Sequence, residues 1–298
     1  MNIIKYKKIF LGISTALVLI AVAVVGAKGL DYGVEFTGGA VLEMSYDERP
    51  SIEEAKTLLV EKGFEVDVQN FGEKSLIIKT QDVSEEGRKS LTSAMSSIGN
   101  NPELKRFNSI GPSVGRELRT KSLYALIFVS LGIIFFVAYA FRSVSKPVSS
   151  WKYGLVAVIA LLHDIMIPVG ILTLLGTEID TLYVVGLLSI LGLSVNDTIV
   201  VFDRVREELA KNNETSKKED FDDTVGYAVS KTVTRSILTS LTLVVVLLAL
   251  YYVGPVATQT LALVLLLGTI VGTYSSIFLA SPLLTYMVSS KKEEKKKK

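Results

Sequence analysis

Two adjacent polar residues, Asn196 and Asp197, interrupt a long apolar run in the stretch "GLSVNDTIVVFDR". A carboxylate near the centre of a membrane-spanning helix costs about 2.5–3.5 kcal/mol, so such residues face a protein interior or a wet cavity. They also commonly mark ion or proton pathways. Asp197 is therefore the first candidate for a coupling residue, with Asn196 beside it. The structural alternative for Asp197 is a fixed hydrogen bond between packed helices.

The strongest cation at a comparable position is Arg235, in "VSKTVTRSILTSLT". It shares one helical face, by spacings of three and four, with a set of hydroxyl residues: Thr232, Ser236, Thr239 and Ser240. Facing acidic and basic helices would form a buried ion pair or a proton site. The alternative for Arg235 is an arginine at the membrane boundary that reaches water and sets topology.

A second acidic position, His163 and Asp164, interrupts the apolar stretch "AVIALLHDIMIPVG". Histidine exchanges protons near neutral pH, although a lone histidine can equally be a satisfied interior residue. The cost of a carboxylate deep in a bilayer favours a functional role for Asp164. We treat this pair as a secondary intramembrane polar site.

Several catalytic classes lack their residues in this sequence. The 298 residues include one histidine and no cysteine, which excludes a thiolate or poly-histidine metal site. The sequence has no G-x-x-x-x-G-K-[ST] stretch, and "GLSVND" does not supply the GxGD site of aspartyl intramembrane proteases. We expect no enzyme activity, no cofactor, no metal and no nucleic-acid partner. An ion gradient of 100 mV, which supplies about 2.3 kcal/mol per charge, is the expected energy source, with protons and sodium both open.

The elements that must position these residues are apolar helices. Hydrophobic residues make up 49% of the chain and charged residues 21%, and six apolar runs reach the ~18 residues needed to cross a hydrocarbon core. The sequence therefore predicts an integral membrane α-helical protein, with the first run kept as a helix rather than cleaved as a signal peptide. The predicted spans are Ile9–Ala27, Leu123–Phe141, Tyr153–Leu175, Ile179–Phe202, Ile237–Val253 and Val256–Val288.

Lysine and arginine gather before the first span, between spans two and three, between spans four and five, and in the tail "KKEEKKKK". The connections "GTEID" and "YVGPVA" contain neither residue, so the positive-inside rule places both termini in the cytoplasm. The predicted divisions are 1–30 (N-terminus and first helix), 31–119 (exported domain), 120–202 (helices two to four), 203–234 (cytoplasmic basic loop), 235–288 (helices five and six) and 289–298 (Lys-rich tail).

The exported segment 31–119 shows strand and helix signals in the order β-α-β-β-α-β. Its first strand is predicted over "EFTGGAVLEMSY", and two helices begin at serine caps in "SIEEAKTLLVEKG" and "SEEGRKSLTSAMSSIG". This order is typical of a ferredoxin-like α+β domain, an antiparallel sheet with helices on one face. The acidic residues of this segment are scattered, so we expect a docking or substrate-handling surface rather than a catalytic site.

Glycines at helical spacing predict where the spanning helices approach one another. Gly192 lies on a stripe of small and polar residues in the fourth span, and Gly268 and Gly272 form a G-x-x-x-G pair in the sixth. Small residues allow close contact between membrane helices. We therefore predict helix packing at all three glycines.

Four motifs together resemble the SecD/SecF family of protein-export membrane proteins, and in particular its SecF branch. This family is related to the RND transporters. The motifs are "GVEFTGG", "LLHDI", "GLSVNDTIVVFDRVRE" and "VSKTVTRSILTSLT". Their order and spacing cover nearly the whole chain. By this resemblance the family's intramembrane aspartate falls on Asp197, preceded by Asn196, and the arginine of its fifth span falls on Arg235. Glu35 stands where the family usually has aspartate.

The resemblance implies an RND-like half of six transmembrane helices with one exported domain between the first two. It further implies a heterodimer with SecD in the bacterial inner membrane, working with the SecYEG translocon and YajC on unfolded preprotein. The implied activity is gradient-driven promotion of late steps of protein export. An RND-like subunit that exports small solutes or lipids is the alternative.

Overall fold

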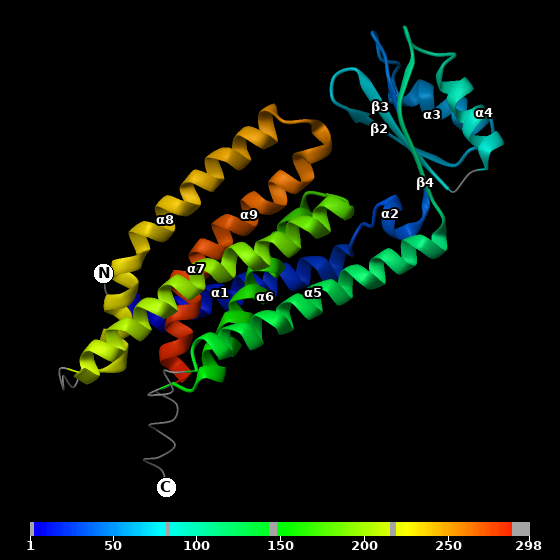
Figure 1. The fold of residues 1–298 in the computed structure, drawn as a ribbon. Helices are drawn as coiled ribbons and strands as arrows, with labels where there is room; N and C mark the ends of the chain where they lie inside the picture. Colours follow the sequence, from blue (N-terminus) through cyan, green and yellow to red (C-terminus); the bar gives the residue numbers. More distant parts are fainter. Residues whose placement is uncertain (1–2, 82–83, 143–147, 215–218, 288–298) are drawn as a thin grey trace. The chain divides into compact units, whose positions relative to one another are not determined.

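A computed structural model of the chain describes residues 3–81, 84–142, 148–214 and 219–287 (Figure 1). Val288 and the predicted Lys-rich tail at 289–298 lie outside the described residues. Contacts divide the chain into two units. The helical unit comprises Met1–Asp31, Ala125–Thr177 and Leu182–Lys298, and the α+β unit comprises Tyr32–Tyr124 and Glu178–Thr181.

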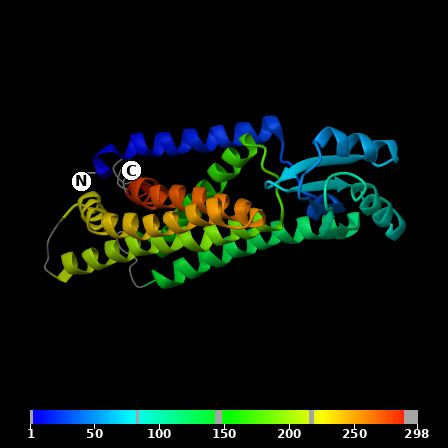
Figure 2. The same ribbon diagram turned by 90° about the horizontal axis from the view of Figure 1, so that it is seen from above.

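Six helices are long and apolar enough to cross a membrane, which confirms the predicted fold class. They are α1 (Lys7–Lys28, after the 3₁₀ turn η1, Ile3–Tyr6), α5 (Pro112–Ala140), α6 (Ser150–Leu174), α7 (Thr181–Glu214), α8 (Phe221–Val253) and α9 (Gln259–Ser275). The sixth span continues from α9 through a π-helical turn, η3 (Ser276–Ala280), to Met287. Figure 2 shows the helices running alongside one another.

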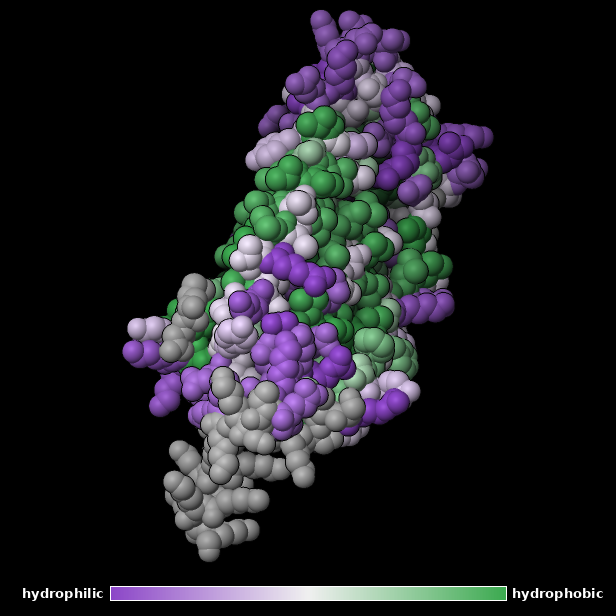
Figure 3. Space-filling model, turned by 60° about the vertical axis from the view of Figure 1, so that its left-hand side comes forward, coloured by the Kyte–Doolittle hydropathy of each residue, from purple (hydrophilic) through white to green (hydrophobic). Residues whose placement is uncertain are grey.

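Large apolar side chains are exposed on the outside of the helical unit, and Figure 3 shows hydrophobic residues over much of the middle of the face in view. Phe128 on α5 is 69% exposed, and Leu19 on α1 is 63% exposed. Soluble monomers rarely expose apolar patches of this extent, whereas lipid tails solvate them without cost. The chain is therefore a multi-pass membrane protein. Inside the unit, α6 contributes more buried residues than any other helix and packs against α1 and α9.

The segment 203–234, expected as a basic loop, is helical over most of its length. α7 continues to Glu214 and α8 already begins at Phe221, so Arg235 lies within a helix instead of opening one. The α7 extension has ion pairs three and four residues apart, Arg204 with Glu207 and with Glu208, both at 2.6 Å. Such pairs stabilise exposed helices. Lys217 and Lys218 of this segment lie outside the described residues.

Both ends of the described chain are fixed at the same end of the helical unit. Lys7, in the first turn of α1, forms an ion pair of 2.5 Å with Asp222 of α8 and a hydrogen bond of 3.4 Å to Thr285. Lys152 at the start of α6 donates to the carbonyl of Met287 at 2.7 Å. These contacts hold the beginnings of α1, α6 and α8 against the end of the sixth span.

The glycines of the sixth span face α7. A Cβ on Gly268 would overlap the side chain of Ile190, and a Cβ on Gly272 would lie 3.1 Å from the Cβ of Ser194. A Cβ on Gly192 would meet no atom within 4 Å, so this glycine makes no close helix contact within the described part of the chain. Gly186 instead makes the close approach from α7, because a Cβ there would lie 2.7 Å from Val264 of α9.

The α+β unit contains a four-stranded antiparallel sheet in the order β2-β3-β1-β4. Its elements are α2 (Val34–Thr37), β1 (Gly39–Ser45), α3 (Ile52–Glu61), β2 (Val66–Phe71), β3 (Ser75–Thr80), α4 (Glu85–Met95) and β4 (Glu103–Ile110). The predicted β-α-β-β-α-β order is confirmed. As expected, Ser51 and Ser84 cap the helices, accepting from the backbone N–H of Glu54 and Gly87 at 3.1 and 3.3 Å.

The first predicted strand begins too early. Residues Val34–Thr37 form the short helix α2, and β1 starts only at Gly39. Gly38 and Gly39 have φ values of 84° and 140°, and a Cβ on Gly38 would lie 2.6 Å from Pro112. This glycine pair therefore separates α2 from β1, because a side chain would be strained at both positions. In the core beyond β1, the Tyr46 hydroxyl donates to the Met95 carbonyl at 3.1 Å, and burial raises its pKa to about 12.

The connection between α6 and α7 contributes its last residues to the α+β unit. Glu178 forms a half-buried ion pair with Lys79 of β3, and the Gly33 N–H donates to the Ile179 carbonyl at 3.0 Å. Tyr32 and Ile179 form a parallel β-bridge. The acidic character of "GTEID" thus has a local structural use, since Glu178 matches a lysine of the sheet.

The α7–α9 contact predicts the effect of adding one methyl group. We expect Gly268→Ala to lower the stability of the full chain by about 1–3 kcal/mol, because the methyl meets the Ile190 side chain. Thermal unfolding in detergent measures the loss. Gly192→Ala is the matched control and should leave the unfolding midpoint unchanged or raise it slightly, because its Cβ meets open space. Equal midpoints for the two variants would contradict this packing.

The Lys79–Glu178 pair predicts a local charge-reversal effect. In Glu178→Lys two lysines would face each other, and we expect the Gly33 amide to exchange hydrogen about fivefold faster, for a loss of about 1 kcal/mol. Combining Lys79→Glu with Glu178→Lys should restore protection. Reversing the exposed Lys105–Glu103 pair of 2.6 Å is the control and should leave the Gly33 amide unaffected. Failure of the double variant to recover would show that the pair does not hold this segment.

Candidate functional site

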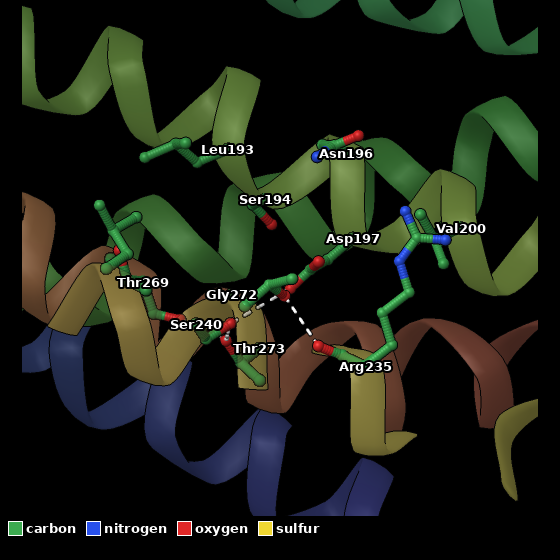
Figure 4. A pocket seen from close by; sticks show the side chains of 13 residues that line it. Leu193, Ser194, Asn196, Asp197, Val200, Arg235, Ser240, Thr269, Gly272 and Thr273 are labelled. Atoms are coloured by element: carbon green, nitrogen blue, oxygen red, sulfur yellow. Dashed lines mark hydrogen bonds between the residues drawn. The ribbon is translucent and has the colours of Figure 1, made fainter. Parts of the chain in front are cut away.

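Asp197 borders a cavity of about 160 Å³ formed by α7, α8 and α9 (Figure 4). The carboxylate is half-buried and accepts a long hydrogen bond of 3.5 Å from the Ser240 hydroxyl. Ser240 in turn accepts from Thr273 of α9 at 2.5 Å. The polar face predicted on the fifth span therefore does meet Asp197, through Ser240. Since one water occupies about 30 Å³ of liquid volume, the cavity has room for several.

Arg235 lines the same cavity but does not form the ion pair considered as one alternative. Among the described residues, no basic nitrogen lies within 4.0 Å of the Asp197 carboxylate. Arg235 is exposed, and Figure 4 shows its side chain extending toward Val200. It also lines a second cavity of about 370 Å³ that contains Asp203, Glu207 and Lys231. The guanidinium thus also borders a cavity lined by charged residues, where water can solvate it and the desolvation cost of a buried pair is avoided.

Asn196 does not join this arrangement as expected. Figure 4 shows its amide directed away from Asp197, and the residue is exposed. Successive residues of a helix point about 100° apart, since a turn takes 3.6 residues. Asn196 borders the cavity without pointing toward the carboxylate.

The most completely buried carboxylate of the helical unit is Asp164 of α6, with 0% exposure among the residues that the structure describes. One of its oxygens lies 2.9 Å from Nδ1 of His163. The other accepts hydrogen bonds from the hydroxyls of Ser194 on α7 and, at 2.7 Å, Ser275 on α9. Three helices therefore supply donors to one carboxylate.

His163 completes this cluster from the same helix. The side chain is 3% exposed, and its Nε2 has no hydrogen-bond partner in the described part of the chain. The ring stacks on Tyr274, with centroids 6.1 Å apart, and the Tyr274 hydroxyl accepts from Ser14 of α1 at 3.4 Å. The pair predicted as a secondary site is thus more deeply buried and has more hydrogen bonds than Asp197.

Ser194 and Ser275 were not predicted as site residues. Ser194 lies three residues before Asp197 and thirty after Asp164, and it is one of a buried series on α7 with Ile190, Thr198 and Val201. The stripe proposed from glycine spacing followed the neighbouring, more exposed face of the helix. The available signal was a second set of hydroxyls at helical spacing, Ser194 with Thr198, whose hydroxyl lies 3.1 Å from Ser276.

The comparisons with known proteins agree on one family. Residues 90–290 match the family described as "Protein export membrane protein SecD/SecF, C-terminal", and residues 23–48 match the "SecD/SecF GG Motif". The protein translocase subunit SecF of Thermobaculum terrenum is 37% identical, over 95% of this chain and 92% of its own. The chain belongs to the SecD/SecF family. The protein translocase subunit SecF of Desulfurispirillum indicum is 34% identical over 92% of this chain and 87% of its own.

Solved structures of SecDF have the same fold. The crystal structure of SecDF from Thermus thermophilus, described as a translocon-associated membrane protein, superposes with a TM-score of 0.81 at 31% identity and covers 96% of this chain. A second SecDF structure, in a super-membrane-facing form, gives a TM-score of 0.71 at 28% identity over 100% of this chain. This chain spans 38% and 40% of those two longer chains.

Proposed function

We propose that this chain acts in protein export as the SecF subunit of the protein translocase. The observation that carries the proposal is a half-buried carboxylate, Asp197, at the wall of a cavity within the membrane-spanning helices. Because the chain belongs to a family of protein-export membrane proteins, we assign this carboxylate a role in export. The chain uses no nucleotide of its own, because the sequence contains no phosphate-binding loop.

Asp197 couples an ion gradient to export by gaining and losing one cation. Each charge that crosses 100 mV releases about 2.3 kcal/mol, enough to shift a two-state equilibrium by more than tenfold. The proton is the favoured ion, because Asp197 has one long hydroxyl bond rather than a cage of oxygens. Arg235 lines both cavities and supplies a positive potential near Asp197, while Asn196 borders the same space.

The partner of the chain is SecD, because the solved SecDF chains are more than twice as long and this chain covers 38% of one of them. SecD and this chain together assist the SecYEG translocon, with YajC, on unfolded preprotein in the bacterial inner membrane. Lys5, Lys7 and Arg142 lie at one end of the helices, which favours cytoplasmic termini and an exported α+β unit.

Export of small solutes or lipids by an RND-like subunit is the alternative. The two proposals differ in what copurifies: SecD and the translocon for protein export, or further copies of a solute exporter. The named relatives are translocase subunits, which favours protein export.

Replacing Asp197 with asparagine tests the coupling role. The amide keeps the shape but cannot carry a charge, so we expect the gradient-dependent part of preprotein export into vesicles to be lost. Export measured after the gradient is collapsed should stay unchanged, and so should assembly with SecD. The assay is run with proton and sodium gradients separately, which identifies the ion.

The matched control is Asp203→Asn, which removes a carboxylate from the same helix but outside the Asp197 cavity. It should keep most of the gradient-dependent export. Full stimulation in the Asp197→Asn vesicles would make that carboxylate structural and remove the basis of the coupling mechanism.

A further inference from the structure

Ser194 belongs to two sites at once. Ser194 lines the Asp197 cavity, and its hydroxyl donates to the buried carboxylate of Asp164. Figure 4 shows Ser194 one turn before Asp197 on the same helix. One small side chain therefore separates a cavity that can hold water from a carboxylate with 0% exposure.

The Asp164–His163 pair has the charge properties of a site for one proton. With Asp164 ionised and His163 neutral, the pair has a net charge of −1, and burying an uncompensated charge is costly. One added proton makes the pair neutral, whether it resides on the carboxyl or on the imidazole. His163 Nε2, buried and without a partner in the described residues, provides a second position for it.

Few charged groups surround the pair. α1 has no acidic or basic residue between Lys8 and Lys28, and α5 has none between Lys121 and Ala140. α9 presents Tyr274 to the imidazole, α7 presents Ser194 next to Asp197, and α8 reaches the cavity with Arg235. In the described part of the chain the ion-pair partner of Asp164 is His163 alone, so a proton is the means of neutralising this carboxylate.

We propose that the Asp164–His163 pair stores one proton, and that this proton enters and leaves through the Ser194 hydroxyl from the Asp197 cavity. On entry, Ser194 passes its hydroxyl proton to the Asp164 carboxylate and receives another from a protonated water in the cavity, which becomes neutral water, so the serine is unchanged. The charge of the pair goes from −1 to zero. Release follows the same steps in reverse.

The fold provides for movement at this point. Ser275 is the last residue of α9, and the π-helical turn η3 begins at Ser276. π-helical turns occur frequently at functional sites. Ser275 bonds both Asp164, at 2.7 Å, and the Gly272 carbonyl, at 3.0 Å, so it can release the carboxylate and keep a partner when the charge is neutralised.

The single histidine of the chain makes this proposal directly measurable. The full chain, labelled with ¹⁵N-histidine and placed in lipid bilayers, gives imidazole signals from His163 alone. Nδ1 lies 2.9 Å from Asp164, so its signal reports a proton on either member of the pair. We expect the signals of the ring nitrogens to follow the gain of one proton that is shared with Asp164. In Asp164→Asn the proton can no longer be shared with a carboxylate, so we expect this shared step to be lost.

Ser194→Ala tests the route. We expect exchange between the protonated and deprotonated signals to slow by about tenfold or more, because the proton loses its relay. The matched control is Thr198→Val, which removes a buried hydroxyl one turn further along α7 that bonds Ser276 rather than Asp164. It should leave the exchange rate unchanged.

Three results would overturn the proposal: imidazole signals that do not change over the pH range in which the chain stays folded, equal exchange rates in Ser194→Ala and Thr198→Val, or signals that respond to sodium at constant pH. The proposal takes its proton route from the proposed role of Asp197. Because the measurement needs no export, its failure can be distinguished from failure of the coupling function: Asp197→Asn can lose export while the His163 titration remains.

Discussion

The cost of placing a carboxylate among apolar helices determines how the helical unit is built. Asp164 and Asp197 would each destabilise the membrane-spanning bundle if left unsolvated. The two carboxylates are stabilised in different ways. Asp164 is surrounded by donors from three helices. Asp197 borders a cavity with room for water and has one long hydroxyl bond. One carboxylate is therefore fully enclosed and the other borders a cavity, although both sites are bounded by α7 and α9.

Close packing of α7 and α9 makes this arrangement possible. Gly268 and Gly272 bring the backbone of α9 against Ile190 and Ser194 of α7. That approach is what lets Ser194 and Ser275, from two different helices, reach the same oxygen of Asp164. The same helix places Thr273 on Ser240, which bonds Asp197. The glycine contact and the polar network are one structural feature, because a longer helix separation would leave both carboxylates short of donors.

Much of this was predictable from sequence, because strong local signals carried it. Six apolar runs and the β-α-β-β-α-β order follow from composition, periodicity and serine caps, and the intramembrane carboxylates are conspicuous among apolar neighbours. The errors concern which face of a helix meets which partner. Gly192 and Asn196 share a stripe with good spacing, yet that stripe is the exposed one. The helical form of 203–234 was missed because charge alone suggested a loop, whereas ion pairs such as Arg204–Glu208 support a helix.

Hydroxyl partners, rather than a fixed cation, explain how these carboxylates can change charge. A lysine or arginine in contact stabilises only the ionised form, so a proton would have to displace it. A hydroxyl can donate to a carboxylate and accept from a carboxylic acid, so it satisfies both forms after a rotation. Ser194, Ser240 and Ser275 all have this property, whereas Arg235 forms no ion pair with Asp197 in the described part of the chain and also lines the outer cavity. The helices thus provide partners that stay satisfied whether a carboxylate is ionised or protonated, while the permanent charge of Arg235 also borders the outer cavity.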